Sequence, residues 1–371
     1  MTDLRQFRAE VVAFVEAAKE SGIACPAFGA IVPPDMVELS QRWQAHAFAN
    51  GWSALHWPVE HGGRGLSRAH TTVWYEECAR AQVAPYLNLQ GYVLAAESIM
   101  RSGTDEQQAA FLPRTAAGDI VWCQLFSEPG AGSDLAGLQT SAVRDGDDYV
   151  LNGQKVWSSN AQFADYGILL ARTSLDLPRH KGISFFLLDM RLPGIDVRPL
   201  RQMTGDEEFC EVFFDDVAVP RSSLLGPENE GWRVAMEVLG DERGSFGEAG
   251  VISLDQRLDV MASVSVGSGN RTAIATDALA DLLVRGGALK AFLQRTDGDV
   301  ALAPATKLLR TELTSAADAF EAGVRGAGAM LLDDVTNQFL YSPGMRIAGG
   351  SSEIQRNIVG ERVLGLPREP G

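Results

Sequence analysis

The stretch Trp122-Cys123-Gln124-Leu125-Phe126-Ser127-Glu128-Pro129-Gly130-Ala131-Gly132-Ser133-Asp134-Leu135 marks the clearest change of pattern in this 371-residue chain. An apolar run that is typical of a strand stops at a serine and a Glu-Pro step, and a turn with two glycines, a hydroxyl and a carboxylate follows. Glycine lets a backbone approach a ligand closely, and successive N–H groups in such a turn can bind an anion. The stretch is therefore either an ordinary strand and turn or a strand that seats a flat, phosphate-bearing nucleotide.

The composition is that of a globular protein, with 46% hydrophobic and 22% charged residues, and the length allows two or three domains. The net charge of −16 argues against binding to nucleic acid or to an anionic membrane. No run of about 18 apolar residues and no secretory signal is visible, so we expect a cytoplasmic protein.

Four cysteines stand in the chain, at Cys25, Cys78, Cys123 and Cys210. They form no C-x-x-C pair, and no cluster of cysteine and histidine has metal-ligand spacing. The sequence therefore predicts reduced, buried thiols and no metal site.

The periodicity divides the chain into a helical segment, a β segment and a second helical segment. Residues 104–107 (T-D-E-Q) form a capping box that opens a helix, and an apolar helix is expected over 86–100. From residue 121 the period becomes that of strands, and Asp145-Gly146 is a hairpin signal. Further strands are expected at residues 166–172, 183–190, 195–200 and 211–219. Helices are expected to cover residues 272–295 and 304–332.

Three motifs resemble those of the acyl-CoA dehydrogenases. The opening stretch is similar to the family's first flavin signature, an apolar run followed by T/S-E-P-x-A-G-S-D. Residues 152–160 (N-G-Q-K-V-W-S-S-N) resemble the family's N-G-x-K-x-W-I-T-N, and residues 349–358 (G-G-S-S-E-I-Q-R-N-I) resemble its closing motif. The motifs stand in the family's order and at its spacing along essentially the whole chain.

The resemblance implies an α+β fold with three domains. These are an N-terminal helical domain at residues 1–120, a middle antiparallel β domain at 121–228 and a C-terminal four-helix bundle at 229–371. FAD would lie between the β domain and the bundle.

By matching position, the resemblance also implies roles for single residues. Phe126 and Ser127 would contact the flavin ring, Trp157 would pack against it, and the Ser159 hydroxyl would face N5, where it could stabilise charge on the reduced flavin. Ser133 would bond the pyrophosphate and also contact the substrate. The complete set of implied cofactor-binding residues is Leu125, Phe126, Ser127, Gly132, Ser133, Trp157, Ser159, Ser351 and Glu353.

A catalytic base must take the α-proton of an acyl thioester while the flavin takes the β-hydride. Many family members carry this base as a glutamate just before the closing Gly-Thr/Ser, but Gly349 stands at that position here. Other members place it on a bundle helix in a pattern that ends E-R. Glu242-Arg243 resembles that pattern, which makes Glu242 the candidate base and Arg243 a candidate contact for CoA. An ordinary solvated ion pair is the alternative.

Two family elements that reach a neighbouring subunit's FAD are absent. The family's R-x-x-F-G has no match at its usual position, and its Q-x-x-G-G is replaced by residues 324–328 (V-R-G-A-G). The resemblance therefore points to members that pair two unlike chains as an α2β2 heterotetramer with one FAD per unlike pair. This chain would be the base-bearing partner, and such pairs often act on bulky acyl-CoAs, including steroid-derived ones.

We thus expect FAD-dependent α,β-dehydrogenation of an acyl-CoA thioester, with an electron-transferring flavoprotein as acceptor. A flavin oxidase on a related substrate remains an alternative. A catalytically silent subunit that supports a partner is another, because Gly349 leaves the commoner base position empty. A doubly wound dinucleotide fold is disfavoured, since no G-x-G-x-x-G follows a first strand.

Overall fold

The computed structural model describes residues 3–29, 31–267, 272–296 and 300–368, and within these it leaves out the side chains of residues 241–249, 265–267, 296 and 300. The chain forms two compact units, Met1–Leu239 and Gly240–Gly371. Each has its own hydrophobic core, in the sheet of the first unit and among the helices of the second. Helix α6 (Gly231–Gly267) begins in the first unit and continues into the second.

Helices make up the first part of unit 1. They are α1 (Leu4–Glu20), η1 (Pro34–Met36), α2 (Val37–Ala49), η2 (Val59–His61), α3 (Arg68–Ala81), the π-helical η3 (Gln90–Ala95), α4 (Ala96–Ser102) and α5 (Asp105–Ala117). The predicted capping box is confirmed, because Thr104 and Gln107 bond each other's backbone N–H at the start of α5. The single helix expected over residues 86–100 is instead divided between η3 and α4.

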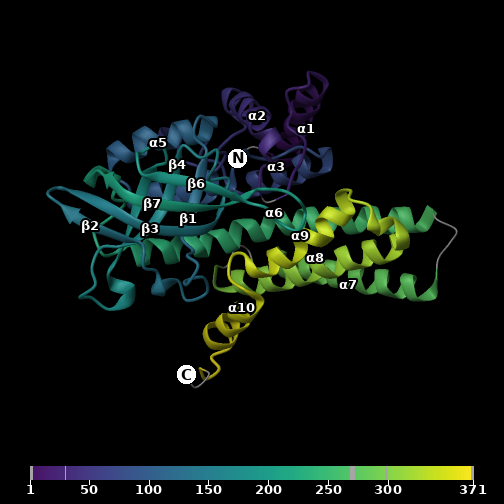
Figure 1. The fold of residues 1–371 in the computed structure, drawn as a ribbon. Coiled ribbons are helices and arrows are strands. Elements are labelled where there is room, and N and C mark those ends of the chain that lie inside the picture. The colour runs from purple at the N-terminus through teal and green to yellow at the C-terminus, as the bar shows by residue number, and fades with distance from the viewer. Residues whose placement is uncertain (1–2, 30, 268–271, 297–299, 369–371) are drawn as a thin grey trace. The chain divides into compact units, whose positions relative to one another are not determined.

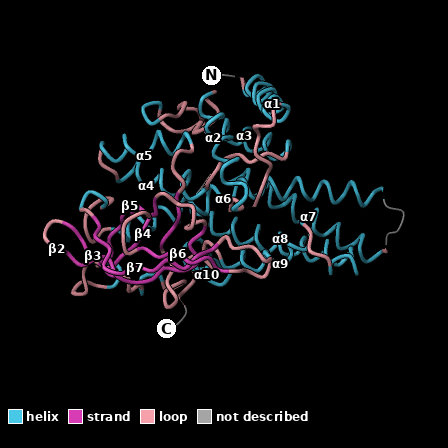
Figure 2. The backbone as a smooth tube through the Cα atoms, turned by 45° about the horizontal axis from the view of Figure 1, so that its top comes forward, coloured by secondary structure: helices cyan, strands magenta, loops and turns pink. Residues whose placement is uncertain are grey.

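Aromatic stacking holds α1, α2 and α3 together. Phe14 stacks on Trp43 with ring centroids 5.7 Å apart, and Trp43 stacks on Trp74 at 6.3 Å. These helices and α5 lie on one side of the sheet (Figures 1 and 2). Their large buried side chains explain why this part of the chain reads as helical from its apolar spacing.

A seven-stranded sheet follows. Its strands are β1 (Trp122–Leu125), β2 (Ser141–Asp145), β3 (Asp148–Ser159), β4 (Tyr166–Arg172), β5 (Ile183–Asp189), β6 (Ile195–Leu200) and β7 (Phe209–Val219). The order is β1-β4-β2-β3-β7-β6, and β5 pairs with β4. The sheet is mainly antiparallel, as predicted, while β4 pairs in parallel with β1 and with β2. The hairpin predicted at Asp145-Gly146 joins β2 to β3.

The second unit contains the rest of α6 with α7 (Ala273–Thr296), η7 (Val300–Leu302), α8 (Ala303–Arg325), η8 (Gly326–Met330), α9 (Asp334–Ile347), α10 (Ser352–Ile358) and the π-helical η9 (Val359–Val363). Its core is formed by apolar side chains of α6, α7 and α8, such as Leu258, Leu282 and Leu313. The helix expected over 304–332 ends earlier, at Arg325, because Gly326 takes a positive φ of 54°. Helix α9 was not predicted from the apolar pattern, since Pro343 and Gly344 interrupt it.

All four cysteines are buried and unpaired within the described chain. Burial raises the pKa of the Cys25, Cys78, Cys123 and Cys210 thiols. No described helix is long and apolar enough to cross a bilayer.

Candidate active site

Loop 127–134 leaves the end of β1 as a tight turn with an open side. The backbone groups of Glu128 and Ala131 bond each other in both directions at 3.0 Å. Gly132 and Ser133 are exposed, and a Cβ added at Gly130 or Gly132 would meet no atom within 4 Å. The loop therefore presents free backbone surface to a ligand, as its glycines suggested.

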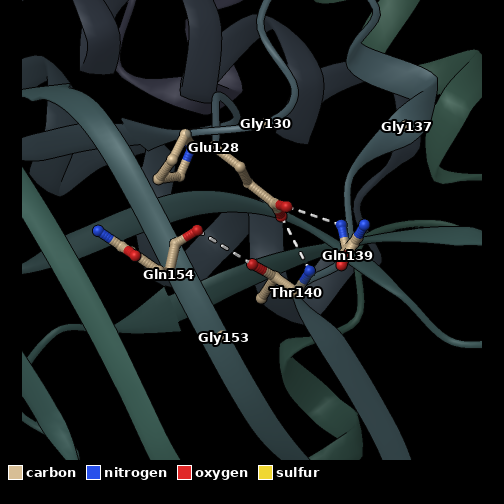
Figure 3. A pocket seen from close by; sticks show the side chains of 8 residues that line it. Glu128, Gly130, Gly137, Gln139, Thr140, Gly153 and Gln154 are labelled. Atoms are coloured by element: carbon tan, nitrogen blue, oxygen red, sulfur yellow. Dashed lines mark hydrogen bonds between the residues drawn. The ribbon is translucent and has the colours of Figure 1, made fainter.

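A buried ion pair lies behind this loop. Lys155 on β3 is 0% exposed and donates from Nζ to the Phe126 carbonyl at 3.0 Å and to Glu128 Oε1 at 2.8 Å. The same carboxylate accepts the backbone N–H groups of Gln139 at 2.7 Å and Thr140 at 2.9 Å (Figure 3). One pair of side chains thus joins the end of β1, the turn, the segment before β2, and β3.

The pKa values of both members of this pair are lowered. Burial by itself raises the pKa of Glu128, but the Lys155 ammonium and the hydrogen bonds from Thr140 and Gln139 outweigh it, so the pKa lies below its usual value. Burial lowers the pKa of Lys155 to about 8, although the Glu128 carboxylate opposes this shift. Arg172 on β4 lowers the pKa of Lys155 further.

Trp157 stands on a β-bulge near the end of β3. The register of β3 against β7 shifts between Lys155 and Ser158, and Trp157 has a φ of 60°, a left-handed value that side chains other than glycine rarely adopt. Its indole is 61% exposed and meets Phe209 edge-on at 6.1 Å. A large exposed aromatic ring on a strained backbone is typical of a ligand-contacting surface.

The residues after Trp157 continue the irregular strand end. Ser159 is half-buried, and Asn160 has a φ of 59° and bonds the Glu208 carbonyl through its backbone N–H at 2.9 Å. Burial raises the pKa of Glu208 to about 7, and Asp206 adds to the shift. The bulge is thereby tied to the segment that leads into β7.

A cavity of about 400 Å³ opens beside loop 127–134 (Figure 3). Trp157, Ser159 and Ser133 do not line it. Its lining consists of Glu128, Pro129, Gly130, Gly137, Gln139, Thr140, Gly153 and Gln154.

In the second unit, residues 348–351 form the turn between α9 and α10. Gly349 and Gly350 have positive φ values of 65° and 92°. The buried Lys307 donates to the Gly350 carbonyl at 2.7 Å and to the Arg346 carbonyl at 3.2 Å, and Gln355 donates to the Gly349 carbonyl at 2.8 Å. Ser351 caps α10 by accepting the backbone N–H of Ile354.

The predicted site residues differ in their exposure. The side chains of Leu125 and Phe126 are buried, and the Phe126 ring packs edge-on against Phe185 at 5.8 Å. Glu353 is exposed and has a lowered pKa, caused first by a hydrogen bond from its own backbone N–H and then by Ser351.

The candidate base Glu242 and its neighbour Arg243 belong to α6, but their side chains fall outside the described residues.

The structure brings the first two motifs together. The Val156 N–H donates to the Ser127 carbonyl at 2.9 Å, so loop 127–134 and the Trp157 bulge are neighbours. The third motif lies in the second unit.

Three family models match successive parts of the chain. The acyl-CoA dehydrogenase N-terminal domain matches residues 2–119, the middle domain matches residues 123–217, and the C-terminal domain matches residues 229–364. A relative from Mycobacterium tuberculosis (strain ATCC 25618 / H37Rv), acyl-CoA dehydrogenase IpdE1, is 38% identical over 392 residues that cover 100% of this chain and 99% of its own. The chain belongs to the acyl-CoA dehydrogenase family.

Another curated relative and two solved structures are also similar to this chain. Acyl-CoA dehydrogenase FadE34 of the same Mycobacterium tuberculosis strain is 37% identical over 95% of this chain and 50% of its own. The ChsE4-ChsE5 complex from Mycobacterium tuberculosis contains a chain that is 30% identical, with a TM-score of 0.82 and coverage of 100% and 99%. A chain of the Tcur3481-Tcur3483 steroid ACAD has a TM-score of 0.84 at 26% identity, with coverage of 99% and 98%. The predicted fold and the prediction of an acyl-CoA dehydrogenase are confirmed.

Membership of the acyl-CoA dehydrogenase family implies a flavin, and the described residues fit one. The exposed indole of Trp157 offers a flat apolar face, and the open backbone at Gly132 and Ser133 suits a phosphate. Sequence reasoning did not place Lys155 and Glu128 in the site, although a lysine within an otherwise apolar strand pattern is a signal for a buried pair. No group of three or more metal-ligating side chains is present among the described residues.

Proposed function

We propose that the chain catalyses FAD-dependent α,β-dehydrogenation of an acyl-CoA thioester. The observation that carries this proposal is the exposed, strained Trp157 next to the open loop 127–134, in a chain of the acyl-CoA dehydrogenase family. FAD, when bound, would supply N5 as the acceptor of the β-hydride. Trp157 would exclude water from one face of the ring, and Ser159 would donate to it from the same strand end.

The protein's own residues would supply the proton chemistry. Glu242 would take the α-proton on its carboxylate, so that loss of the proton from Cα and of the hydride from Cβ leaves a carbon–carbon double bond. Ser133 and Arg243 would hold the CoA portion of the substrate. Glu242 has this role by its match to the E-R pattern, and Gly349 at the commoner position is consistent with it.

A second, unlike acyl-CoA dehydrogenase chain would complete the FAD site in an α2β2 heterotetramer. Three observations support this. Residues 324–328 lack the family's neighbour-reaching Q-x-x-G-G, and relatives of similar structure come from the ChsE4-ChsE5 and Tcur3481-Tcur3483 assemblies. Large apolar side chains at Met330, Leu331 and Leu332 are also 86%, 69% and 68% exposed on this chain, which is typical of a protein interface.

The substrate would be a bulky acyl-CoA of the steroid-derived class. The Tcur3481-Tcur3483 relative is named as a steroid ACAD. An electron-transferring flavoprotein would accept the electrons, and the reaction would take place in the cytoplasm.

The experiment is native mass spectrometry and flavin spectroscopy of the chain expressed alone and together with an unlike partner chain. We expect little FAD on the single chain and one FAD per unlike pair on co-expression. An active homo-oligomer with a full complement of FAD would overturn the heterotetramer.

Gly349 favours a second candidate, a silent supporting subunit. A Glu242→Gln variant of the complex decides between them, because turnover that is unchanged would remove Glu242 as the base.

A further inference from the structure

We propose that Lys155 is a positioning residue for the flavin site, which aims the Ser127 N–H at the cofactor by holding the Phe126 carbonyl, with Glu128 keeping the ammonium in place. This inference rests on the proposed function, because it assigns a role toward the same cofactor. Lys155 does not touch the ligand surface, since its side chain is fully buried.

Lys155 fixes the direction of one peptide group. The Phe126 carbonyl accepts from Lys155 Nζ at 3.0 Å and therefore points toward this buried ammonium. The peptide between Phe126 and Ser127 is planar and trans, so the Ser127 N–H points the opposite way. The next carbonyl, that of Ser127, is taken by the Val156 N–H at 2.9 Å. With both carbonyls engaged, the N–H and hydroxyl of Ser127 are the groups left to face a ligand.

The Lys155 ammonium is a strong anchor for this peptide. Hydrogen bonds to an ion are about twice as strong as those between neutral groups, so the ammonium fixes the carbonyl better than water would. Lys155 is itself fixed by Glu128 at 2.8 Å, and Glu128 is fixed by two backbone N–H groups of the segment before β2. Protonation of Lys155 is therefore coupled to the geometry of the loop.

Charged groups of two other segments face Lys155. Glu128 from the loop raises the pKa of Lys155, and Arg172 from β4 lowers it. Because burial brings this pKa to about 8, loss of the proton falls within the range in which the protein can be titrated. Burial also raises the pKa of Glu208, beside β7 and near the bulge, to about 7. The experiment must therefore distinguish the titration of Glu208 from that of Lys155.

The experiment titrates the flavin absorbance spectrum and measures the Kd of FAD in the complex of this chain with its partner. The variants are Lys155→Met, Glu128→Gln and Glu208→Gln. Glu77→Gln is the matched control, because Glu77 is a carboxylate of 3% side-chain exposure that pairs with Arg8 and Arg80 far along the chain from the loop.

We expect a spectral transition near pH 8 in the unaltered complex and in the Glu208→Gln and Glu77→Gln variants. Lys155→Met abolishes it and weakens FAD binding by about tenfold, which corresponds to one lost hydrogen bond to the ligand. Glu128→Gln moves the transition to lower pH, because the carboxylate that raises the pKa of Lys155 is gone. A structural role alone would not move this midpoint.

The proposal is overturned if the complex binds FAD but shows no transition between pH 7 and 10, or if Lys155→Met binds FAD as tightly as Glu77→Gln. A transition that disappears in Glu208→Gln would assign it to Glu208 and also overturn the role of Lys155. A complex that holds no flavin at all would instead refute the proposed function, and the inference would fall with it.

Discussion

Replacement of Trp157 by alanine tests whether the exposed indole is the wall of the flavin site. A tryptophan side chain offers about 250 Å² of surface, so an exposed fraction of 61% leaves roughly 150 Å² available to a ligand. A flat ring can cover one face, or about half of that area. At about 25 cal/mol per Å² this contact contributes roughly 2 kcal/mol, which corresponds to a Kd about thirtyfold weaker in the variant.

The assay is the quenching of flavin fluorescence on titration of the apo complex with FAD. Trp157→Phe keeps an aromatic face and is expected to lose only part of the affinity. Val143→Ala is the matched control, because Val143 is 62% exposed on the β2 hairpin and lies in none of the three motifs. Alanine at position 157 keeps the left-handed strain and gives up the packing of the indole on Phe209, so the thermal midpoint should fall, and the FAD titration is run well below it. An FAD affinity of Trp157→Ala within twofold of the unaltered complex would refute the assignment.

Four further predictions concern catalysis and stability. Glu242→Gln should lower turnover by about 10²- to 10⁴-fold in a steady-state assay while the FAD content of the complex stays the same, and a loss of FAD would point to a structural role instead. Gly287→Ala should stabilise the chain by about 0.5–1 kcal/mol in denaturant unfolding, because its Cβ would meet nothing within 4 Å on α7. Gly286→Ala should be less stable than Gly287→Ala by about 1–3 kcal/mol, since its Cβ would lie 2.5 Å from the buried Leu258 Cδ1, and equal midpoints would contradict this packing. Glu128→Gln should reduce the loss of folding stability in acid. A carboxylate whose folded pKa lies below its ordinary value of 4.5 contributes stability above that pH and loses it as the pH falls through the folded pKa. Equal acid sensitivity of the variant and the unaltered chain in a pH series of unfolding curves would count against the buried pair.

The sequence predicted the strands best where periodicity and burial coincide. Residues 166–172 and 195–200 are β4 and β6 at the predicted bounds, because both runs are limited by clear turn residues. The capping box at Thr104 was equally clear, since it depends on neighbouring residues alone. The end of α8 was placed too late, because Ala-Gly-rich sequence continues the helical pattern past Arg325 while Gly326 leaves the helix.

The geometry of the site was harder to predict. A positive φ at a tryptophan cannot be read from a pattern, because tryptophan disfavours that conformation and adopts it only where the fold requires it. The full burial of Lys155 depends on residues 126–128 and 139–140, which no local pattern around position 155 reveals. Glu242 stays a prediction, since its side chain lies outside the described residues.

The state of the four cysteines has a practical consequence for labelling. Each thiol is buried and its pKa is raised, so the thiolate that reacts with maleimides is scarce at neutral pH. The unaltered chain should thus react very slowly with maleimides, and no cysteine needs to be removed first. A single exposed cysteine, such as one introduced by Val143→Cys, would accept a fluorophore selectively and report the docking of the partner chain by energy transfer.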